Sequence, residues 1–323
     1  MPREFAVRWL VHLLLIALVG FAATPAKAIV DPDVAGVIAV PGGRIWYRIN
    51  GTAHFAAGKT ALLVLHGGPG GTHRSRLPLL DLADERPVIL YDQLDSGHAD
   101  HPGDPANWTL ARFVAEIDAI RAHLGLSAVI VLGHSWGGSI AAAYGARAPQ
   151  GLKALILSSP LISTPRWIAD NAAHVAALPE ETRRAIARHE AAGTTDSADY
   201  LAAVEVFNKR HLCRADPCPM GDAGNDAPAF NRVIYKAMWG PSEFTATGSL
   251  KDLDLTPRLG GITAPTLYLC GTYDEAPPAT CRDFARLSPN AAFVEVPETG
   301  HATMFEARAF YIQAVRVFLK GLD

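Results

Sequence analysis

The segment Gly133-His134-Ser135-Trp136-Gly137-Gly138 restricts the possible folds of this 323-residue chain more than any other stretch. It follows the apolar run 128–132, which predicts a buried strand, and precedes 139–148, whose small residues suit a helix. A side chain on a sharp strand-to-helix turn needs neighbours without bulk, and the glycines beside this serine leave that room. The segment therefore predicts a turn that holds Ser135 out as a nucleophile.

Apolar runs recur along the rest of the chain, and helical segments separate several of them. Continuous runs such as 61–65 are typical of strands covered on both faces of a sheet. The apolar spacing within 109–124 predicts a helix. Alternating strands and helices predict an α/β fold with a mostly parallel central sheet flanked by helices. The expected strands are 43–49, 61–65, 88–91, 128–132, 154–157, 266–270 and 293–296.

Residues 160–241 differ from the rest of the chain in composition and in apolar spacing. Ala-rich helical stretches cover 167–191 and 200–210, and no clear strand run interrupts them. A helical insertion between two sheet-forming halves would lie above the carboxyl ends of the strands, where ligands bind in open α/β sheets. We expect a helical cap over 160–241 and a core formed by 29–159 and 242–323.

Two backbone groups are candidates for binding an oxyanion near Ser135. The glycine-rich loop His66–Gly71 follows another buried strand and can turn the N–H of Gly68 toward the site. The helix after Ser135 points its positive N-terminus at the same place, with the N–H of Trp136 as the second donor. We predict an oxyanion hole formed by these two groups.

A nucleophilic serine needs a base and a carboxylate that orients the base. In folds of this kind they follow the serine in the order Asp, then His. Asp274 lies just after the strand 266–270, and His301 lies just after the strand 293–296. Both fall on loops at strand carboxyl ends, the edge where Ser135 emerges. We predict the triad Ser135, Asp274 and His301.

Charge and ligand spacing argue against other classes. A net charge of −3 and a pI near 6.5 provide no broad positive field, so nucleic acid is not an expected partner. No histidine stands at zinc-finger spacing beside the cysteines, and Asp95, His98, Asp100 and His101 match no ligand pattern. We expect no metal site.

The first 28 residues have the pattern of a signal peptide. Arg3 and Arg8 precede the apolar stretch 9–23, and Ala26-Lys27-Ala28 gives a small-residue cleavage site. The alternative is a membrane anchor, although 15 apolar residues fall short of the roughly 20 that span a bilayer. We expect an exported protein, periplasmic or secreted, with no stable membrane insertion after cleavage.

The four cysteines form two close pairs in the sequence, Cys213 with Cys218 and Cys270 with Cys281. Export to an oxidising compartment makes two local disulfides plausible. Four cysteines allow three connectivities, and buried free thiols are the alternative.

After the signal segment, nearly the whole chain resembles the proline iminopeptidases and tricorn-interacting aminopeptidases, which are α/β-hydrolase serine peptidases. Beside the Ser135 turn, the shared segments are His66-Gly67-Gly68-Pro69-Gly70-Gly71, Tyr91-Asp92-Gln93, His211-Leu212-Cys213-Arg214 with Asp216-Pro217, Gly240-Pro241-Ser242-Glu243-Phe244 and Tyr273-Asp274-Glu275.

The resemblance implies an α/β-hydrolase fold with an inserted helical cap. It also implies a serine aminopeptidase that releases an N-terminal residue, proline or a small apolar one, from short peptides through an acyl-enzyme. No metal or organic cofactor takes part in this family. Ser135, Asp274 and His301 match its triad, and Gly68 and Trp136 match its oxyanion donors. The resemblance adds Glu243 and Glu275, at positions that hold the free amino group of the substrate.

Two departures from the family pattern and two alternatives stay open. Asp95 stands where the family has a glycine, and Cys218 stands where relatives often carry a tryptophan, so the cap and a loop near the site can differ. The same triad could serve an amidase or esterase acting on small molecules such as aminoacyl amides. A silent binding protein on the same scaffold is disfavoured because every triad member is present. No pattern indicates an oligomeric state.

Overall fold

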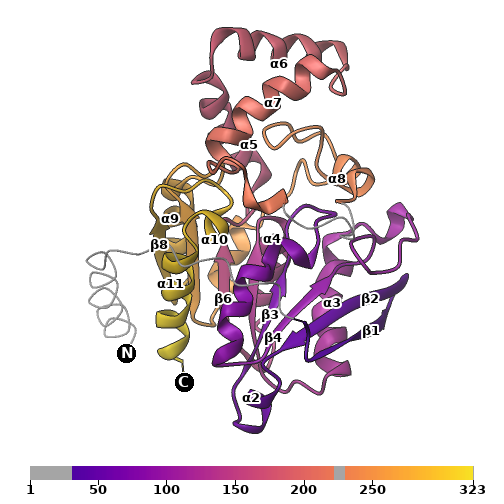
Figure 1. Ribbon diagram of the computed structural model, residues 1–323, viewed down its shortest axis with the longest axis vertical. Coiled ribbons are helices and arrows are strands. Elements are labelled where there is room, and N and C mark those ends of the chain that lie inside the picture. The colour runs from indigo at the N-terminus through magenta and orange to yellow at the C-terminus, as the bar shows by residue number, and fades with distance from the viewer. Residues whose placement is uncertain (1–30, 222–229, 323) are drawn as a thin grey trace.

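The structure is a computed structural model that describes residues 31–221 and 230–322; the predicted signal peptide, 1–28, lies outside these residues. Within them, eight strands form one sheet in the order β1-β2-β4-β3-β5-β6-β7-β8, with helices on both faces (Figure 1). From β4 onward in this order the strands are parallel to one another, while β2 is antiparallel to both β1 and β4. The predicted α/β fold with a mostly parallel sheet is confirmed.

The strands are β1 Val34–Val40, β2 Gly43–Asn50, β3 Ala61–Leu65, β4 Val88–Asp92, β5 Val129–His134, β6 Leu152–Ser158, β7 Thr266–Gly271 and β8 Ala291–Val296. The α-helices are α2 Ala53–Ala56, α3 Leu110–His123, α4 Trp136–Gly145, α5 Thr164–Ala176, α6 Glu180–Ala192, α7 Ala198–His211, α8 Arg232–Met238, α9 Pro278–Leu287, α10 Thr303–Glu306 and α11 Arg308–Lys320. The 3₁₀ segments are η1 His73–Asp84, η2 Pro105–Asn107, η3 Pro219–Gly221 and η4 Thr256–Gly261.

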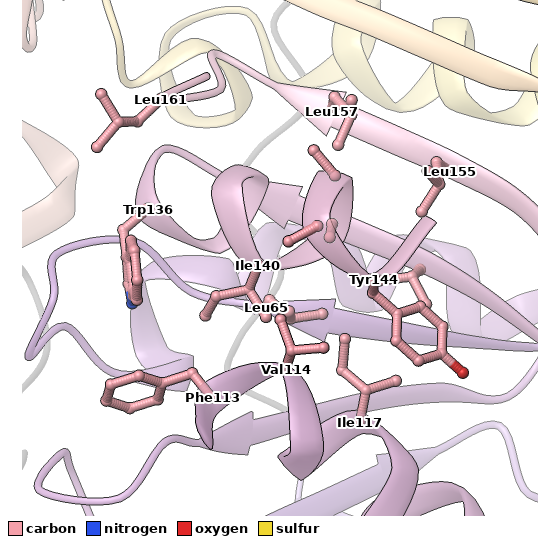
Figure 2. Packing of buried hydrophobic residues seen from close by; sticks show 14 of the residues in the cluster. Leu65, Phe113, Val114, Ile117, Trp136, Ile140, Tyr144, Leu155, Leu157 and Leu161 are labelled. Atoms are coloured by element: carbon pink, nitrogen blue, oxygen red, sulfur yellow. The ribbon is translucent and has the colours of Figure 1, made fainter. Parts of the chain in front are cut away.

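The central strands are continuous apolar runs because both faces of the sheet are covered. Successive side chains of a strand point to opposite faces. In β3, Leu63 and Leu65 belong to the apolar cluster that includes α3 and α4, while Leu62 and Val64 belong to the cluster that includes η1 and α11. Figure 2 shows part of the first cluster, in which side chains of α4 pack with residues of β3, β6 and α3.

Two local predictions differ from the structure. Strand β1 was not predicted, because it is an edge strand whose side chains are mostly exposed, so burial imposes no clear alternation on its sequence. The helical stretch 167–191 is two helices, α5 and α6, and not one. Pro179 separates them, since proline lacks an N–H and disfavours helical backbone at the residue before it.

Helices α5 to α8 form the insertion between β6 and β7. Figure 1 shows α6 and α7 at the end of the molecule farthest from the sheet. They pack around an apolar cluster of their own, which contains Tyr200, Phe207 and Phe244. The predicted cap limits of 160 and 241 stay a prediction, and residues 222–229 within them lie outside the described part. No described helix has the length and apolar character needed to cross a membrane.

Candidate active site

Ser135 occupies a one-residue turn between β5, which ends at His134, and α4, which begins at Trp136. Its φ of 56° and ψ of −122° lie in a region that non-glycine residues rarely adopt. A Cβ on Gly133 would lie 2.1 Å from the carbonyl oxygen of Gly137, and a Cβ on Gly137 would lie 2.4 Å from that of Leu65. Both neighbours must therefore be glycine. Helix α4 begins three residues before the predicted start at 139.

The glycine-rich loop after β3 lies against this turn. A Cβ on Gly67 would lie 3.0 Å from the Cβ of Ser135, so loop and serine are in contact. Gly68 has a φ of 117°, which favours glycine. Trp136 is the first residue of α4, and the first N–H groups of a helix have no partner within it. Among the described residues, no loop or cap hydrogen bond is donated by the N–H of Gly68 or Trp136.

Asp274 and His301 form a buried pair at the carboxyl ends of β7 and β8. The His301 Nδ1 atom lies 2.8 Å from Oδ1 of Asp274, and the aspartate is fully buried. Because the carboxylate can only accept, Nδ1 carries the proton of the neutral ring, which leaves the Nε2 lone pair free to take another proton. The Asp274 carboxylate also accepts hydrogen bonds from Ser159 Oγ and from the N–H groups of Gly271 and Ala276. These contacts fix the orientation of the imidazole.

The ring of His301 lies beside the Ser135 turn. Its centroid is 4.5 Å from the ring of His134, whose Nε2 donates a 3.0 Å hydrogen bond to the carbonyl oxygen of His301. Burial lowers the pKa of His134 well below its ordinary value, so this ring stays neutral at physiological pH. Trp167 of α5 meets the His301 ring edge-on at 5.7 Å.

Two glutamates are electrostatically coupled to the same histidine or to each other. Glu275 is fully buried, its Oε1 lies 3.4 Å from His301 Nε2, and neither carboxyl oxygen has a hydrogen-bond partner among the described residues. Burial raises the pKa of Glu275 well above 4.5, and the negative charges of Glu243 and Asp274 raise it further. Burial also raises the pKa of Glu243, an effect that the Tyr235 hydroxyl and His301 oppose. No lysine or arginine of the described residues pairs with either glutamate.

The insertion holds the loop that carries His301. The N–H of His301 donates to the carbonyl oxygen of His211 at 2.8 Å, and Ala302 donates to Leu212 at 2.8 Å. The Glu306 carboxylate accepts hydrogen bonds from the N–H groups of Arg214, Ala215 and Gly300. The end of α7 and the histidine loop therefore form one hydrogen-bonded unit.

The cysteines form two disulfides, Cys213–Cys218 and Cys270–Cys281. The Cys213–Cys218 disulfide directly follows residues 211–212, whose carbonyl groups accept the hydrogen bonds from the His301 loop. The second is fully buried and closes the stretch of chain that contains both Asp274 and Glu275.

The departure from the family pattern at Asp95 has a structural explanation. Asp95 has a φ of 63°, the backbone region that the expected glycine would favour. Its carboxylate accepts from the Gly103 N–H and from Trp108 Nε1, both at 2.8 Å. The nearby Asp100 pairs with Arg44. Within residues 31–221 and 230–322, no group of three metal-ligating side chains is assembled.

Sequence reasoning did not single out Ser159, His134, Trp167 or Tyr235 as parts of the site. Ser159 follows β6 directly and has a φ of 45°, so its position at a strand end was the available signal. The others act through contacts between distant segments, which no local pattern marks.

A serine on a strand-to-helix turn, with an aspartate and a histidine after later parallel strands, is the arrangement of a serine-type α/β hydrolase. Accordingly, a family profile described as the alpha/beta hydrolase fold matches residues 60–307. A proline iminopeptidase of Heyndrickxia coagulans is 42% identical over 290 residues, covering 89% of this chain and 99% of that protein. The chain belongs to the proline iminopeptidase family of α/β hydrolases, as the sequence resemblance predicted.

Two solved structures are similar to this chain over most of its length. A proline iminopeptidase from Mycobacterium smegmatis is 36% identical, with a TM-score of 0.80 over 90% of this chain and 98% of that one. The protein VinJ is 33% identical, with a TM-score of 0.85 over 91% of this chain and 100% of that one.

Proposed function

We propose that the protein releases the N-terminal residue of peptides, proline foremost, by acyl transfer to Ser135. The observation that carries this proposal is the pair of carboxyls, Glu243 and Glu275, which share the surroundings of His301 and have no lysine or arginine as a partner among the described residues. A carboxyl pair beside the base offers a place for the cationic end of a substrate.

In the proposed reaction, His301 Nε2 takes the hydroxyl proton of Ser135 as the serine oxygen attacks the carbonyl carbon of the N-terminal residue. The N–H groups of Gly68 and Trp136 bind the oxyanion. His301 then donates the proton to the leaving amine, and the C–N bond breaks to give an acyl-enzyme. Water, deprotonated by His301, releases the amino acid and regenerates the serine. Throughout the reaction Asp274 accepts the hydrogen bond from Nδ1 of His301, which keeps that proton on the ring.

Recognition of the substrate amine follows from charge and desolvation. An ammonium that enters a partly dry pocket loses hydration, and facing carboxylates compensate for that loss. The secondary ammonium of an N-terminal proline has two N–H donors, one for each of Glu243 and Glu275. An acetylated N-terminus has no such charge and would leave the two carboxyls without a counter-ion.

The test compares prolyl p-nitroanilide with its N-acetyl form on the wild type and on Glu243→Gln and Glu275→Gln. We expect each variant to lose about 10- to 100-fold in kcat/KM on the free amine, since a hydrogen bond to a charged group is worth about 1.5–3 kcal/mol. Ser135→Ala should be folded and inactive. Equal cleavage of the acetylated substrate would contradict amine recognition, and full activity of Ser135→Ala would contradict the proposed nucleophile.

The alternative function, an amidase or esterase on small molecules, is separated by the same assay. Prolinamide and proline methyl ester present the same amine and carbonyl without a peptide leaving group. A clear preference for them over prolyl dipeptides would favour the alternative.

Export is part of the proposal. The pattern of residues 1–28 supports it, as do two disulfides, which persist in oxidising compartments. N-terminal sequencing of protein recovered from a bacterial host should give Ile29 as the first residue. Recovery of uncleaved chain in the membrane fraction would favour the anchor instead.

A further inference from the structure

The side chain of Gln93, directly after β4, joins the two segments that carry the proposed oxyanion donors. Its Nε2 donates a 2.9 Å hydrogen bond to the carbonyl oxygen of His66, in the glycine-rich loop. Its Oε1 accepts a 3.1 Å hydrogen bond from Nε1 of Trp136, at the start of α4. All three residues are buried, with exposed fractions of 1% or less. Only one orientation of the amide satisfies both contacts, because one end must donate and the other must accept.

The backbone N–H of Gln93 is connected to the glycine-rich loop by hydrogen bonds through the side chain of His66. Its N–H donates to Nε2 of His66 at 3.1 Å, so that atom is the unprotonated one. Burial lowers the pKa of His66 to about 4, which keeps the ring neutral with its proton on Nδ1. That proton is donated to the carbonyl oxygen of Gly67 at 2.9 Å. The tautomer of His66 is thus set by Gln93.

The carbonyl of Gly67 and the N–H of Gly68 belong to the same planar peptide unit. A hydrogen bond that fixes the Gly67 oxygen therefore also fixes the direction of the Gly68 N–H, the first oxyanion donor. The same bond polarises the peptide and strengthens that N–H as a donor.

The second donor is tied to Gln93 through the indole ring. Trp136 is fully buried and meets the ring of Phe113 at 90° with centroids 5.7 Å apart. Figure 2 shows these two side chains next to each other. Packing on one side and the Gln93 hydrogen bond on the other leave the indole one position. Because the side chain belongs to the first residue of α4, its position helps to fix the N–H at the helix start.

We propose that Gln93 is a positioning residue that sets the separation and direction of the Gly68 and Trp136 N–H groups. The proposal rests on the proposed acyl transfer at Ser135. It predicts that Gln93 acts on the tetrahedral state, in which negative charge develops on the substrate oxygen, and not on binding of the substrate amine.

The experiment uses Gln93→Met, which keeps the length of the side chain and removes both polar ends. Gln313→Met, an exposed glutamine of α11, is the matched control. On prolyl p-nitroanilide, kcat of Gln93→Met should fall about 10- to 100-fold while KM stays within about twofold, since loss of a whole donor costs about 10²–10³. Circular dichroism and the melting temperature are measured to check that the variant is folded.

Two inhibitors separate positioning from a general structural role. Prolinal forms a tetrahedral adduct with the serine, and its inhibition constant should rise by the same factor by which kcat/KM falls. Pyrrolidine has the ring and the ammonium but no carbonyl or carboxylate oxygen, so it cannot reach the oxyanion donors, and its inhibition constant should not change. An unchanged kcat, or an equal rise in both inhibition constants, would overturn the proposal.

A third measurement keeps this proposal separate from the proposed substrate class. The rate at which a fluorophosphonate labels Ser135 depends on the oxyanion hole and not on a free N-terminus, and Ser135→Ala gives the background. If the wild type labels but does not cleave prolyl substrates, the substrate class is wrong, and the labelling rate still tests Gln93. Equal labelling of the wild type and Gln93→Met would overturn the positioning role.

Discussion

The Nε2 atom of His301 lies 3.4 Å from Oε1 of Glu275, a fully buried carboxyl. The proposed base is thus flanked by two acids, since Asp274 contacts its Nδ1 atom. Their surroundings assign them different tasks. Asp274 accepts hydrogen bonds from four groups, whereas the carboxyl of Glu275 has no hydrogen-bond partner among the described residues. The first holds the ring, and the second is free to meet a substrate.

Glu275→Gln should change the pH dependence of stability. Burial raises the folded-state pKa of this carboxyl above 4.5, so the folded protein keeps a proton that the unfolded chain releases. That contribution to stability is present below pH 4.5 and is lost as pH rises toward the folded-state pKa. Glutamine resembles the protonated acid and does not titrate. The melting temperature of the variant relative to the wild type should therefore rise between pH 5 and pH 8, without substrate. The exposed Glu298→Gln is the control, and a pH-independent difference for Glu275→Gln would contradict the prediction.

Asp274→Asn should keep the fold and lose the reaction. An amide at this position can donate to Nδ1 of His301, which places the ring proton on Nε2 and blocks the base. We expect kcat to fall by about 10⁴-fold with little change in KM. Steady-state kinetics on prolyl p-nitroanilide measure this change, and the inhibition constant of free proline checks that the substrate pocket is intact. A fall of less than tenfold would argue against Asp274 as the orienting acid.

Removing the Cys270–Cys281 disulfide should destabilise the protein by about 2–3 kcal/mol, from the chain entropy of the unfolded state. The double variant Cys270→Ala and Cys281→Ala tests this by urea unfolding. The pair Cys213→Ala and Cys218→Ala is the comparison, and it should cost less because its sequence separation is 5, against 11 for the buried pair. Equal costs for the two pairs would contradict the loop-length argument.

Arg76→Met should stabilise the protein. Arg76 is 3% exposed, and within the described residues its guanidinium has one 3.3 Å hydrogen bond, to Ser75 Oγ, and no carboxylate partner. Burial lowers the pKa of Arg76 from 12.5 to about 10, so at pH 7 the buried charge costs about 3 kcal/mol. We expect the free energy of unfolding to rise by about 1–3 kcal/mol. Arg286→Met, an exposed arginine, should change it little. A loss of stability in Arg76→Met would contradict this account.

The sequence predicted those parts of the molecule that burial imposes on neighbouring residues. Strands β3 and β7 are buried throughout and mostly apolar because both faces of the sheet are covered. Their carboxyl ends could therefore be predicted from the sequence, as could the position of Asp274 after β7. Strand β1 was not predicted because most of its side chains are exposed, so burial imposes no pattern on its sequence. The hydrogen bonds of Ser159 to Asp274 and of His301 to His211 join segments far apart in the chain. Such contacts depend on the completed fold, so no local spacing indicates them.

The backbone hydrogen bonds between the end of α7 and the His301 loop limit how this molecule can change over evolutionary time. In a scaffold whose insertion only rests on the sheet, one insertion could be exchanged for another to obtain a new specificity. Here such an exchange would also remove the partners of His301 and Ala302 and two of the groups held by Glu306. New specificity is therefore more accessible through side-chain changes on α5 and α8, which leave residues 211–215 in place.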